Sequence, residues 1–142
     1  MEIKTLTMEH LNEVIELDQK ITGKNHETYF DKHFRLQMSE SHNDLMFGVY
    51  ENSILQGFLI ATQRQIAFGQ HEEIAYLEMI EVDPEHQKQG LGTIIIKEFQ
   101  KRLKNLKIDK TITMVDWKET LLLNFFNNQG FKKGDMIQLE MS

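Results

Sequence analysis

The chain has 142 residues, which is enough for one domain with a single hydrophobic core. Its hydrophobic content of 40% and charged content of 27% are typical of globular proteins, and its net charge of −6 argues against nucleic-acid binding. It contains no cysteine, which excludes disulfides, thiolate metal sites and a cysteine nucleophile. We see no signal pattern and no apolar run near the ~20 residues of a membrane span, so we expect one cytoplasmic domain over residues 1–142, without nucleic-acid or membrane partners.

The first forty residues predict a strand and two helices. Residues 3–6 read as a short strand, and Thr7 is a suitable N-cap for a helix that ends at Gly23. Apolar side chains then recur at every fourth position of a second predicted helix: Phe30, Phe34 and Met38.

A β-hairpin is predicted after these helices. Residues 46–50 and 54–61 read as strands, and the turn Glu51-Asn52-Ser53 joins them. We expect the second strand to continue past Arg64 to a turn at Gly69-Gln70.

The next predicted strand, at residues 75–82, contains a change in its apolar pattern. Its apolar residues begin on one face of the strand, at Leu77, and continue on the other face, at Ile80. A β-bulge produces such a change of phase, because its extra residue shifts every later side chain to the opposite face. We therefore expect a bulge near Ile80 and Glu81.

The most informative segment is 82–92, Val-Asp-Pro-Glu-His-Gln-Lys-Gln-Gly-Leu-Gly, which joins that strand to a predicted helix at 93–106. The N-terminus of a helix has backbone N–H groups without intrahelical acceptors and a partial positive charge. Gly90 and Gly92 would let an anion approach those donors, as in a phosphate-binding loop. The spacing excludes a Walker loop, because no lysine follows Gly92, and a dinucleotide fingerprint, because residue 95 is isoleucine.

The rest of the chain predicts a strand, a helix and a last strand or two. Residues 111–115 read as a strand, and 119–128 as a helix that stops at Gly130. Phe131 and residues 136–141 would supply the final strands. The element order, β-α-α-β-β-β-α-β-α-β, predicts a mixed α/β sheet with one β-α-β crossover through the glycine-loop helix and a second one after it.

Gln87, Gly90 and Gly92, preceded by Val-x-Pro, resemble the pyrophosphate loop of the GNAT N-acetyltransferase superfamily, and the element order resembles its fold along the whole chain. The resemblance implies a mostly antiparallel sheet flanked by about four helices, with acetyl-CoA as co-substrate. It assigns the pyrophosphate to backbone N–H groups of one run of residues: Gln87, Lys88, Gln89, Gly90, Leu91, Gly92 and Thr93. It assigns the acetyl and pantetheine groups to backbone atoms at an opening beside the bulge: Ile80, Glu81 and Val82.

A second stretch, Asn124-Phe125-Phe126 followed by Gly130-Phe131, resembles the segment of that family which lines the thiol end of the cofactor. The resemblance places Asn124 and Phe126 beside the cofactor. The tyrosine that often protonates the departing thiolate in the family is replaced by Phe126, which has no proton to give. We therefore interpret Phe126 chiefly as a core aromatic, and Asn124 either as a pantetheine contact or as a solvent-facing residue.

Acetyl transfer to an amine requires a base, because an alkyl ammonium with a pKa near ~10.4 has no nucleophilic lone pair at neutral pH. Tyr76-Leu77-Glu78 resembles a stretch of the spermidine/spermine branch of the superfamily, in which the glutamate helps to deprotonate the amine. Glu78 is therefore our first choice, with Glu81 and Asp116 as alternatives. Either glutamate could instead face solvent from the sheet.

We expect direct transfer of acetyl from acetyl-CoA to a primary amine, of a small molecule or of a peptide, within a ternary complex. The two N-terminal helices carry acidic residues that would suit a cationic amine: Glu13, Glu16, Asp18, Glu27 and Asp31. No metal is expected, because the six histidines show no ligand spacing. The alternative is a non-catalytic acyl-CoA sensor, since the usual tyrosine is missing. A short last strand would leave a sheet edge at which a homodimer could form.

Overall fold

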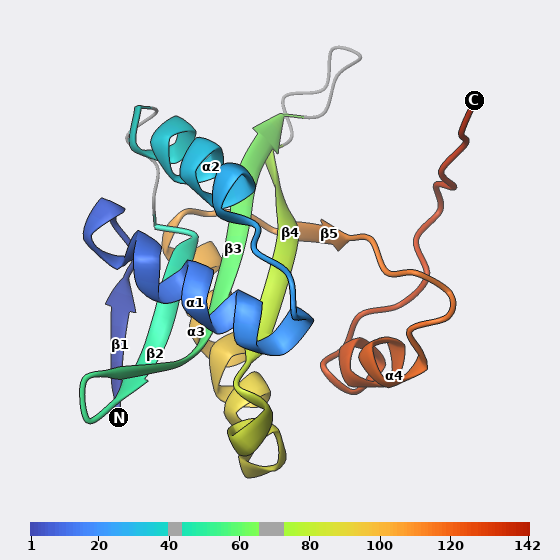
Figure 1. Ribbon diagram of the computed structural model, residues 1–142. Coiled ribbons are helices and arrows are strands. Elements are labelled where there is room, and N and C mark those ends of the chain that lie inside the picture. Colours follow the sequence, from blue (N-terminus) through green and yellow to red (C-terminus); the bar gives the residue numbers. More distant parts are fainter. Residues whose placement is uncertain (40–43, 66–72) are drawn as a thin grey trace.

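The computed structural model describes residues 1–39, 44–65 and 73–142 (Figure 1). Its elements in chain order are β1 (Glu2–Thr5), the 3-10 helix η1 (Met8–His10), α1 (Leu11–Thr22), α2 (Glu27–Ser39), β2 (Met46–Glu51), β3 (Ile54–Gln65), β4 (Glu73–Val82), the 3-10 helix η2 (Pro84–Gln89), α3 (Leu91–Asn105), β5 (Lys110–Thr113) and α4 (Thr120–Asn128). The predicted turn at Gly69-Gln70 lies outside the described residues. Within the described ranges, none of the helices combines the length and the apolar character that a membrane crossing requires.

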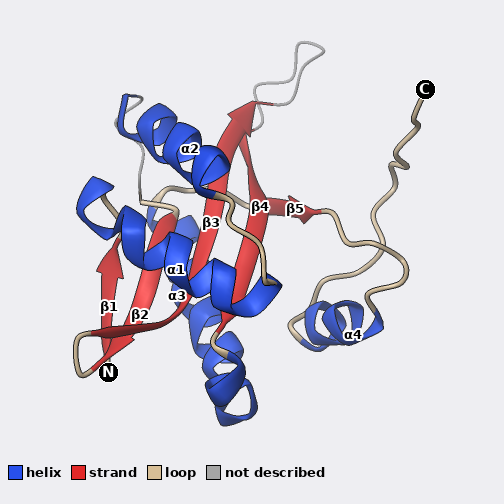
Figure 2. Cartoon of the chain, viewed as in Figure 1, coloured by secondary structure: helices blue, strands red, loops and turns tan. Residues whose placement is uncertain are grey.

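The strands form a single five-stranded sheet in the order β1-β2-β3-β4-β5 (Figure 2). The first four strands are antiparallel neighbours, whereas β5 lies parallel to β4. A parallel neighbour requires a crossover connection, and α3 supplies it between β4 and β5. The structure confirms the predicted mixed α/β fold, its mostly antiparallel sheet and the crossover at the glycine loop.

Helices cover both faces of the sheet (Figure 1). On one face, α1 and α2 pack against β2 and β3, with Phe30 and Phe34 of α2 fully buried. On the other face, the apolar stripe of α3 packs against β2, β3 and β4. Because neighbouring residues of a strand point to opposite faces, Phe58 and Ile60 belong to the first core and Leu59 to the second.

Most of the predicted elements are found, with bounds that differ by a few residues. Thr7 is an N-cap as predicted, and its side chain accepts the Glu9 N–H at 3.3 Å, but it caps η1 rather than α1 directly. Gly23 ends α1 in the left-handed conformation. The β2–β3 hairpin turns through Asn52 and Ser53, which both have positive φ.

The bulge in β4 lies at Glu78, so its predicted position near Ile80 and Glu81 is wrong. Met79 pairs with Ile60 of β3, and Leu77 pairs with the next β3 residue, Ala61. Glu78 therefore has no partner on β3 and is the extra residue of the bulge. Leu77 belongs to the core beneath α3, whereas Met79 packs against the core beneath α1 and α2. The extra residue between them causes the change of phase that the sequence shows.

The strands predicted at Phe131 and at residues 136–141 are also wrong, because residues 129–142 form no helix and no strand. The second predicted crossover is therefore missing, and β5 is the last strand of the sheet. Figure 1 shows this segment leaving α4 and running away from the sheet to the end of the chain. A strand needs a neighbour that pairs with its backbone, and the strands that the structure describes include none beside this segment.

Candidate active site

The sheet opens beside β4 at the point where the bulge lies. β5 pairs with β4 from Ile74 to Leu77, and Thr113 Oγ1 donates to the Leu77 carbonyl at 2.8 Å where this pairing ends. From Glu78 to Val82, β4 pairs only with β3 among the strands of the described ranges. An extended ligand could lie along this half of β4, in the place of a neighbouring strand.

The residues predicted to bind the acetyl and pantetheine groups, Ile80 and Val82, lie on this open half of β4. Their half-buried side chains pack against the core beneath α3. Any contact that they make with a ligand in the opening would therefore come from the backbone, as the resemblance implied.

The glycine loop follows β4 directly. Asp83 caps η2, Gly90 takes the left-handed conformation with φ +75°, and α3 begins at Leu91. The Ile94 N–H bonds to the Gly90 carbonyl at 3.2 Å, so the N–H groups of the residues before Ile94 face out of the helix end. A Cβ at Gly90 would meet no atom within 4 Å, which leaves open space beside these donors. Residues 87–93 thus have the geometry of an anion cradle.

The same loop also contacts α4 at two points. A Cβ at Gly92 would come 2.9 Å from the ring of Phe125, so a side chain here would have to displace that ring. The side-chain amide of Gln129 donates to Thr93 Oγ1 at 3.0 Å. The sequence did not indicate this second role of the loop.

Asp83 links the glycine loop to α1. Asp83 is 6% exposed, and its carboxylate accepts hydrogen bonds from Lys20 Nζ at 2.8 Å and from the Glu85 N–H at 3.0 Å. Burial alone would raise the pKa of Asp83, but the hydrogen bonds from Lys20 and Glu85, together with the charges of Lys20 and His86, hold that pKa below its usual value. The carboxylate is therefore ionised at neutral pH.

We expect Asp83→Ala to lower the free energy of unfolding at pH 7 by about 0.5–2 kcal/mol, the contribution of a helix cap. Because the pKa of Asp83 is lower in the folded protein, its ionisation stabilises the fold above the unfolded pKa, and this contribution is lost as the pH falls through the folded pKa. Urea unfolding at neutral and at acidic pH measures the effect. The difference in the free energy of unfolding between Asp83→Ala and wild type should be smaller in acid. Lys20→Met is the matched control, because it removes the ion pair and leaves the cap. A difference in the free energy of unfolding that is equal at both pH values would contradict the prediction.

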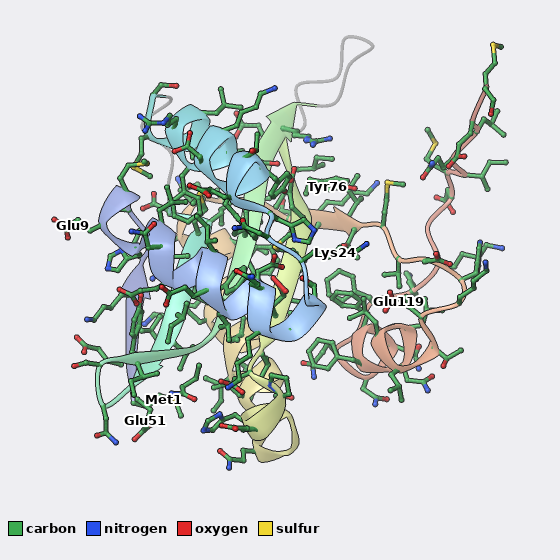
Figure 3. All side chains as sticks on the ribbon, in the orientation of Figure 1. Met1, Glu9, Lys24, Glu51, Tyr76 and Glu119 are labelled. Atoms are coloured by element: carbon green, nitrogen blue, oxygen red, sulfur yellow. The ribbon has the colours of Figure 1, made fainter. Side chains whose placement is uncertain are left out.

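Glu78, the first choice for the base, lies in a polar cluster formed by β3, β4 and α2. Its Oε2 accepts the Tyr29 hydroxyl at 3.0 Å, and its Oε1 accepts Arg64 Nη2 at 3.2 Å. His33 stacks on Tyr29 and places its Nδ1 3.9 Å from Glu78 Oε2. Arg64 also covers the ring of Tyr76, which Figure 3 labels beside β4. Both carboxylate oxygens of Glu78 are therefore engaged by other side chains.

The protonation states in this cluster follow from burial. Burial lowers the pKa of His33, although the charge of Glu78 opposes it, so the imidazole is neutral at neutral pH. Burial, and after it the charge of Glu78, raises the pKa of Tyr29, so the phenol keeps the proton that it donates. The Glu78 carboxylate and the Arg64 guanidinium then leave the cluster with little net charge.

Glu81 forms a second polar cluster on the same face of the sheet. It pairs with Phe58, whose side chain lies in the core beneath α1 and α2, and it neighbours Asp18 of α1. Asp18 is 2% exposed, and its Oδ2 lies 2.5 Å from Nδ1 of His26, in the turn between α1 and α2 that also carries Lys24 (Figure 3). Burial first, and then the neighbouring Asp18, raises the pKa of Glu81 to about 8. A carboxyl with such a pKa is suited to proton transfer near neutral pH.

The other predicted site residues lie apart from these clusters. Asp116 is exposed, and its Oδ1 accepts the Lys118 N–H in the turn before α4. Asn124 is exposed on α4 and lines a cavity of about 1030 Å³ between α3, β5 and α4. The backbone of Gln87 and Lys88 belongs to η2, but their side chains lie outside the described part of the structure.

Phe126 is a core aromatic, as the sequence predicted. It is 4% exposed, and its ring centroid lies 5.5 Å from that of Phe125 and 4.9 Å from that of Phe131. The position is therefore built for an apolar ring rather than for a hydroxyl group.

We expect Phe126→Tyr to lower the melting temperature without raising turnover. The added hydroxyl would enter an apolar cluster, and a buried hydroxyl without a partner costs about 1–3 kcal/mol. For a chain of this size the loss corresponds to a fall of roughly 3–10 °C in Tm. Thermal unfolding and steady-state kinetics of the variant measure the two effects. A gain in kcat at unchanged Tm would show instead that the hydroxyl reaches the reacting thiol.

Sequence reasoning missed most neighbours of the carboxylates in the two clusters: Tyr29, His33 and Arg64 beside Glu78, and His26 beside Asp18. It named Asp18 only as one of several acidic helix residues, of which Asp31 simply pairs with Arg35 four residues later. A signal for Asp18 was present, because it follows Val14 by four residues and so lies on the apolar stripe of α1. A carboxylate at a buried helix position is a stronger indication of function than one on a solvated face.

Residues 11–131 match the profile of the acetyltransferase (GNAT) family. Comparison with curated proteins gave no match. Among solved structures, the aminoglycoside antibiotic 6'-N-acetyltransferase from Acinetobacter haemolyticus has a TM-score of 0.82 at 17% identity, over 100% of this chain and 98% of that one. AAC(6')-Iy in complex with the bisubstrate analogue CoA-S-monomethyl-acetylneamine has a TM-score of 0.82 at 15% identity, over 99% and 97% of the two chains.

Glucosamine-6-phosphate N-acetyltransferase from Arabidopsis thaliana has a TM-score of 0.74 at 16% identity, over 99% of this chain and 97% of that one. At such low identity these structures establish a common fold and nothing finer. The family match spans most of the chain, including the glycine loop, the opening beside β4 and α4. The chain therefore belongs to the acetyltransferase (GNAT) family.

Proposed function

We propose that the chain transfers the acetyl group of acetyl-CoA to the primary amine of a small molecule. The observation that carries the proposal is that three features meet at one end of β4: an opening in the sheet, an anion cradle and a buried glutamate with a raised pKa. The opening begins at Glu78, and the cradle is centred on Gly90, within one strand-loop-helix unit. An extended thioester that carries a pyrophosphate matches this order of features.

The residues present fit acetyl-CoA. The N–H groups at the start of α3, from Leu91 to Thr93, would bind the pyrophosphate together with the turn at Gln87–Gly90, because the space beside Gly90 is open. The backbone from Ile80 to Val82 would bind the pantetheine, and α4 would close the thiol end with Asn124. When bound, the co-substrate supplies an acetyl thioester that a neutral amine can attack.

The chain must remove a proton from the ammonium before the amine can react. We propose Glu81 as the base ahead of Glu78, because Tyr29 and Arg64 already occupy both oxygens of Glu78. Glu81 Oε2, in contrast, is buried and has no hydrogen-bond partner within the described residues. The ionised Glu81 would take the proton from the ammonium, and its raised pKa would favour holding it. Glu78 would then position the amine.

The charge of the acceptor side favours a cationic amine. Asp18 neighbours Glu81 and contacts His26 in the turn between α1 and α2, and a positive amine nearby would favour the ionised form of Glu81. Among the enzymes with this fold, two are named for aminoglycosides and one for glucosamine 6-phosphate, which are small amines, whereas one is named for a ribosomal-protein alanine. We therefore propose a cationic small molecule ahead of a peptide amine.

The test is a thermal-shift measurement followed by an acceptor screen. Acetyl-CoA, CoA, ATP and NAD are compared for stabilisation, and thiol release from acetyl-CoA is then measured with aminoglycosides, polyamines, amino sugars and a lysine peptide. We expect stabilisation by acetyl-CoA and thiol release that depends on an amine. Stabilisation without release by any amine would support the non-catalytic acyl-CoA sensor instead. Stabilisation by ATP or NAD alone would exclude both functions.

A further inference from the structure

Asp18 is a buried carboxylate with two titratable neighbours, Glu81 of β4 and His26 in the turn between α1 and α2. Its Oδ2 lies 2.5 Å from Nδ1 of His26, whose side chain is 41% exposed. An ionised carboxylate can only accept hydrogen bonds, so Nδ1 is the donor and carries the hydrogen. The imidazole therefore supports the negative charge of Asp18 from a position that solvent can reach.

An ion pair fixes α1 against the end of β4. Lys20 of α1 places its Nζ 2.8 Å from Oδ2 of Asp83, the first residue after the strand. The contact holds the last turns of α1 beside Glu81, whose Oε2 is buried and has no hydrogen-bond partner within the described residues. Asp18 thus approaches Glu81 from a helix whose position on the sheet is fixed.

The other charged or titratable groups at this face of the sheet contact one another: Lys20 with Asp83 and Glu85, and Glu78 with Arg64, Tyr29 and His33. Each of these two sets contains charges of both signs, which oppose each other at a distance. Asp18, in contrast, is buried and adjoins Glu81 itself. Its charge therefore acts most directly on the Glu81 carboxyl.

We propose that Asp18 and His26 are positioning residues that together set how readily Glu81 binds a proton. The charge of Asp18 disfavours a second negative charge beside it and so favours the protonated form of Glu81. The hydrogen bond from His26 stabilises that charge on Asp18 alone, so that Asp18 and Glu81 need not share a proton. The two residues would act on the reaction only through Glu81, and the inference rests on the proposed role of Glu81 as the base.

Removing the two residues should have opposite effects on Glu81. Asp18→Asn removes the like charge, so Glu81 should lose its proton at a pH lower by on the order of one pH unit. His26→Ala leaves Asp18 without its donor, so Asp18 and Glu81 would share one proton and Glu81 should lose it at a higher pH than in wild type. The double variant should titrate as Asp18→Asn does, because His26 acts only through Asp18.

Carbon-13 NMR of protein with labelled glutamate carboxyls measures this titration without acetyl-CoA or amine, and Glu81→Gln identifies the signal. In wild type we expect the midpoint near the pKa of Glu81, about 8. The matched control Asp31→Asn removes a carboxylate that pairs with Arg35 on α2, and it should leave this midpoint unchanged. Any order other than Asp18→Asn below wild type and wild type below His26→Ala would overturn the proposal. The exposed His26 position keeps the test valid if Asp18→Asn does not fold, because an unshifted midpoint in His26→Ala alone rejects it.

The pH dependence of kcat/KM separates this inference from the proposed function. The acidic limb of the profile reports the base of the free enzyme, so its midpoint should move in the same direction and by the same amount as the NMR midpoint in each variant. Movement of both midpoints together supports the inference and the role of Glu81. An acidic limb that stays in place while the NMR midpoint moves would reject Glu81 as the base and leave its control by Asp18 and His26 established. An NMR midpoint that moves in neither single variant would reject that control, whatever group is the base.

Discussion

Replacing Glu81 with glutamine is expected to remove most acetyl transfer. Glutamine keeps the size of the side chain but cannot take a proton from the ammonium of the acceptor. A positioned general base typically contributes ~10²–10⁴-fold, so kcat/KM at pH 7 should fall by this order. The loss should diminish as the pH approaches the pKa of the free amine, near ~10.4, because the acceptor then loses its proton without help. Steady-state kinetics across the pH range, with the best amine of the screen, measures both effects.

The same substitution is expected to make the protein more stable. Burial and Asp18 raise the pKa of Glu81 from a usual 4.5 to about 8, so the folded protein binds this proton more tightly than the unfolded chain does. Stability is therefore lost as the pH rises between these two values, where the unfolded chain ionises freely and the buried carboxyl does not. Glu81→Gln removes this loss. In mild acid the Tm of Glu81→Gln should equal that of wild type. As the pH rises, the variant should have the higher Tm by a growing margin. Above the folded pKa of Glu81 this difference in Tm should stay constant.

Two matched variants show whether the role belongs to Glu81. Glu78→Gln changes the other glutamate on the same face of the sheet in the same way, and we expect it to raise KM for the amine more than it lowers kcat. Asp116→Asn removes a charge from an exposed turn and should change little. A pH–rate profile of Glu81→Gln that parallels wild type, with a selective loss of kcat in Glu78→Gln, would return the role of base to Glu78.

The positions of the helices and strands could be predicted because each element buries one face, and the spacing of its apolar side chains reports the period of that element. The exact position of the bulge, in contrast, could not be predicted from this spacing. A change of phase in β4 is visible in the sequence, but Glu78 is the extra residue only in relation to the β3 residues Ile60 and Ala61. Its position depends on pairing between strands, which no pattern within β4 contains.

The glycine loop could be predicted from a local motif, whereas the surroundings of the glutamates could not. The raised pKa of Glu81 arises from contact with Asp18, which lies on a different element far away in the sequence. The alternation at residues 136–141 is a similar case. It predicts a strand that the structure does not form, because a sequence pattern does not say whether a neighbouring strand is available to pair with.

Gly90→Val is expected to weaken acetyl-CoA binding at least about tenfold. Gly90 has φ +75°, a region in which a residue with a side chain is strained by roughly 1–3 kcal/mol. Its Cβ would also project into the open space beside the N–H donors of α3, where we propose that the pyrophosphate binds. A loss of about 1.4 kcal/mol already corresponds to a tenfold change in Kd, and isothermal titration calorimetry measures it directly.

Gly23→Val is the matched control for the backbone strain. Gly23 has φ +77°, and its Cβ would likewise meet no atom within 4 Å, but it ends α1 and lies outside the glycine loop. It should lose comparable stability and keep the Kd of wild type for CoA. Gly90→Asn separates strain from occupation of the cradle, because asparagine tolerates the left-handed conformation, and the affinity that it still loses reflects the side chain in the anion site. If a folded Gly90→Val bound acetyl-CoA as wild type does, the pyrophosphate could not lie at this loop, and the opening beside β4 would have to serve a ligand anchored elsewhere.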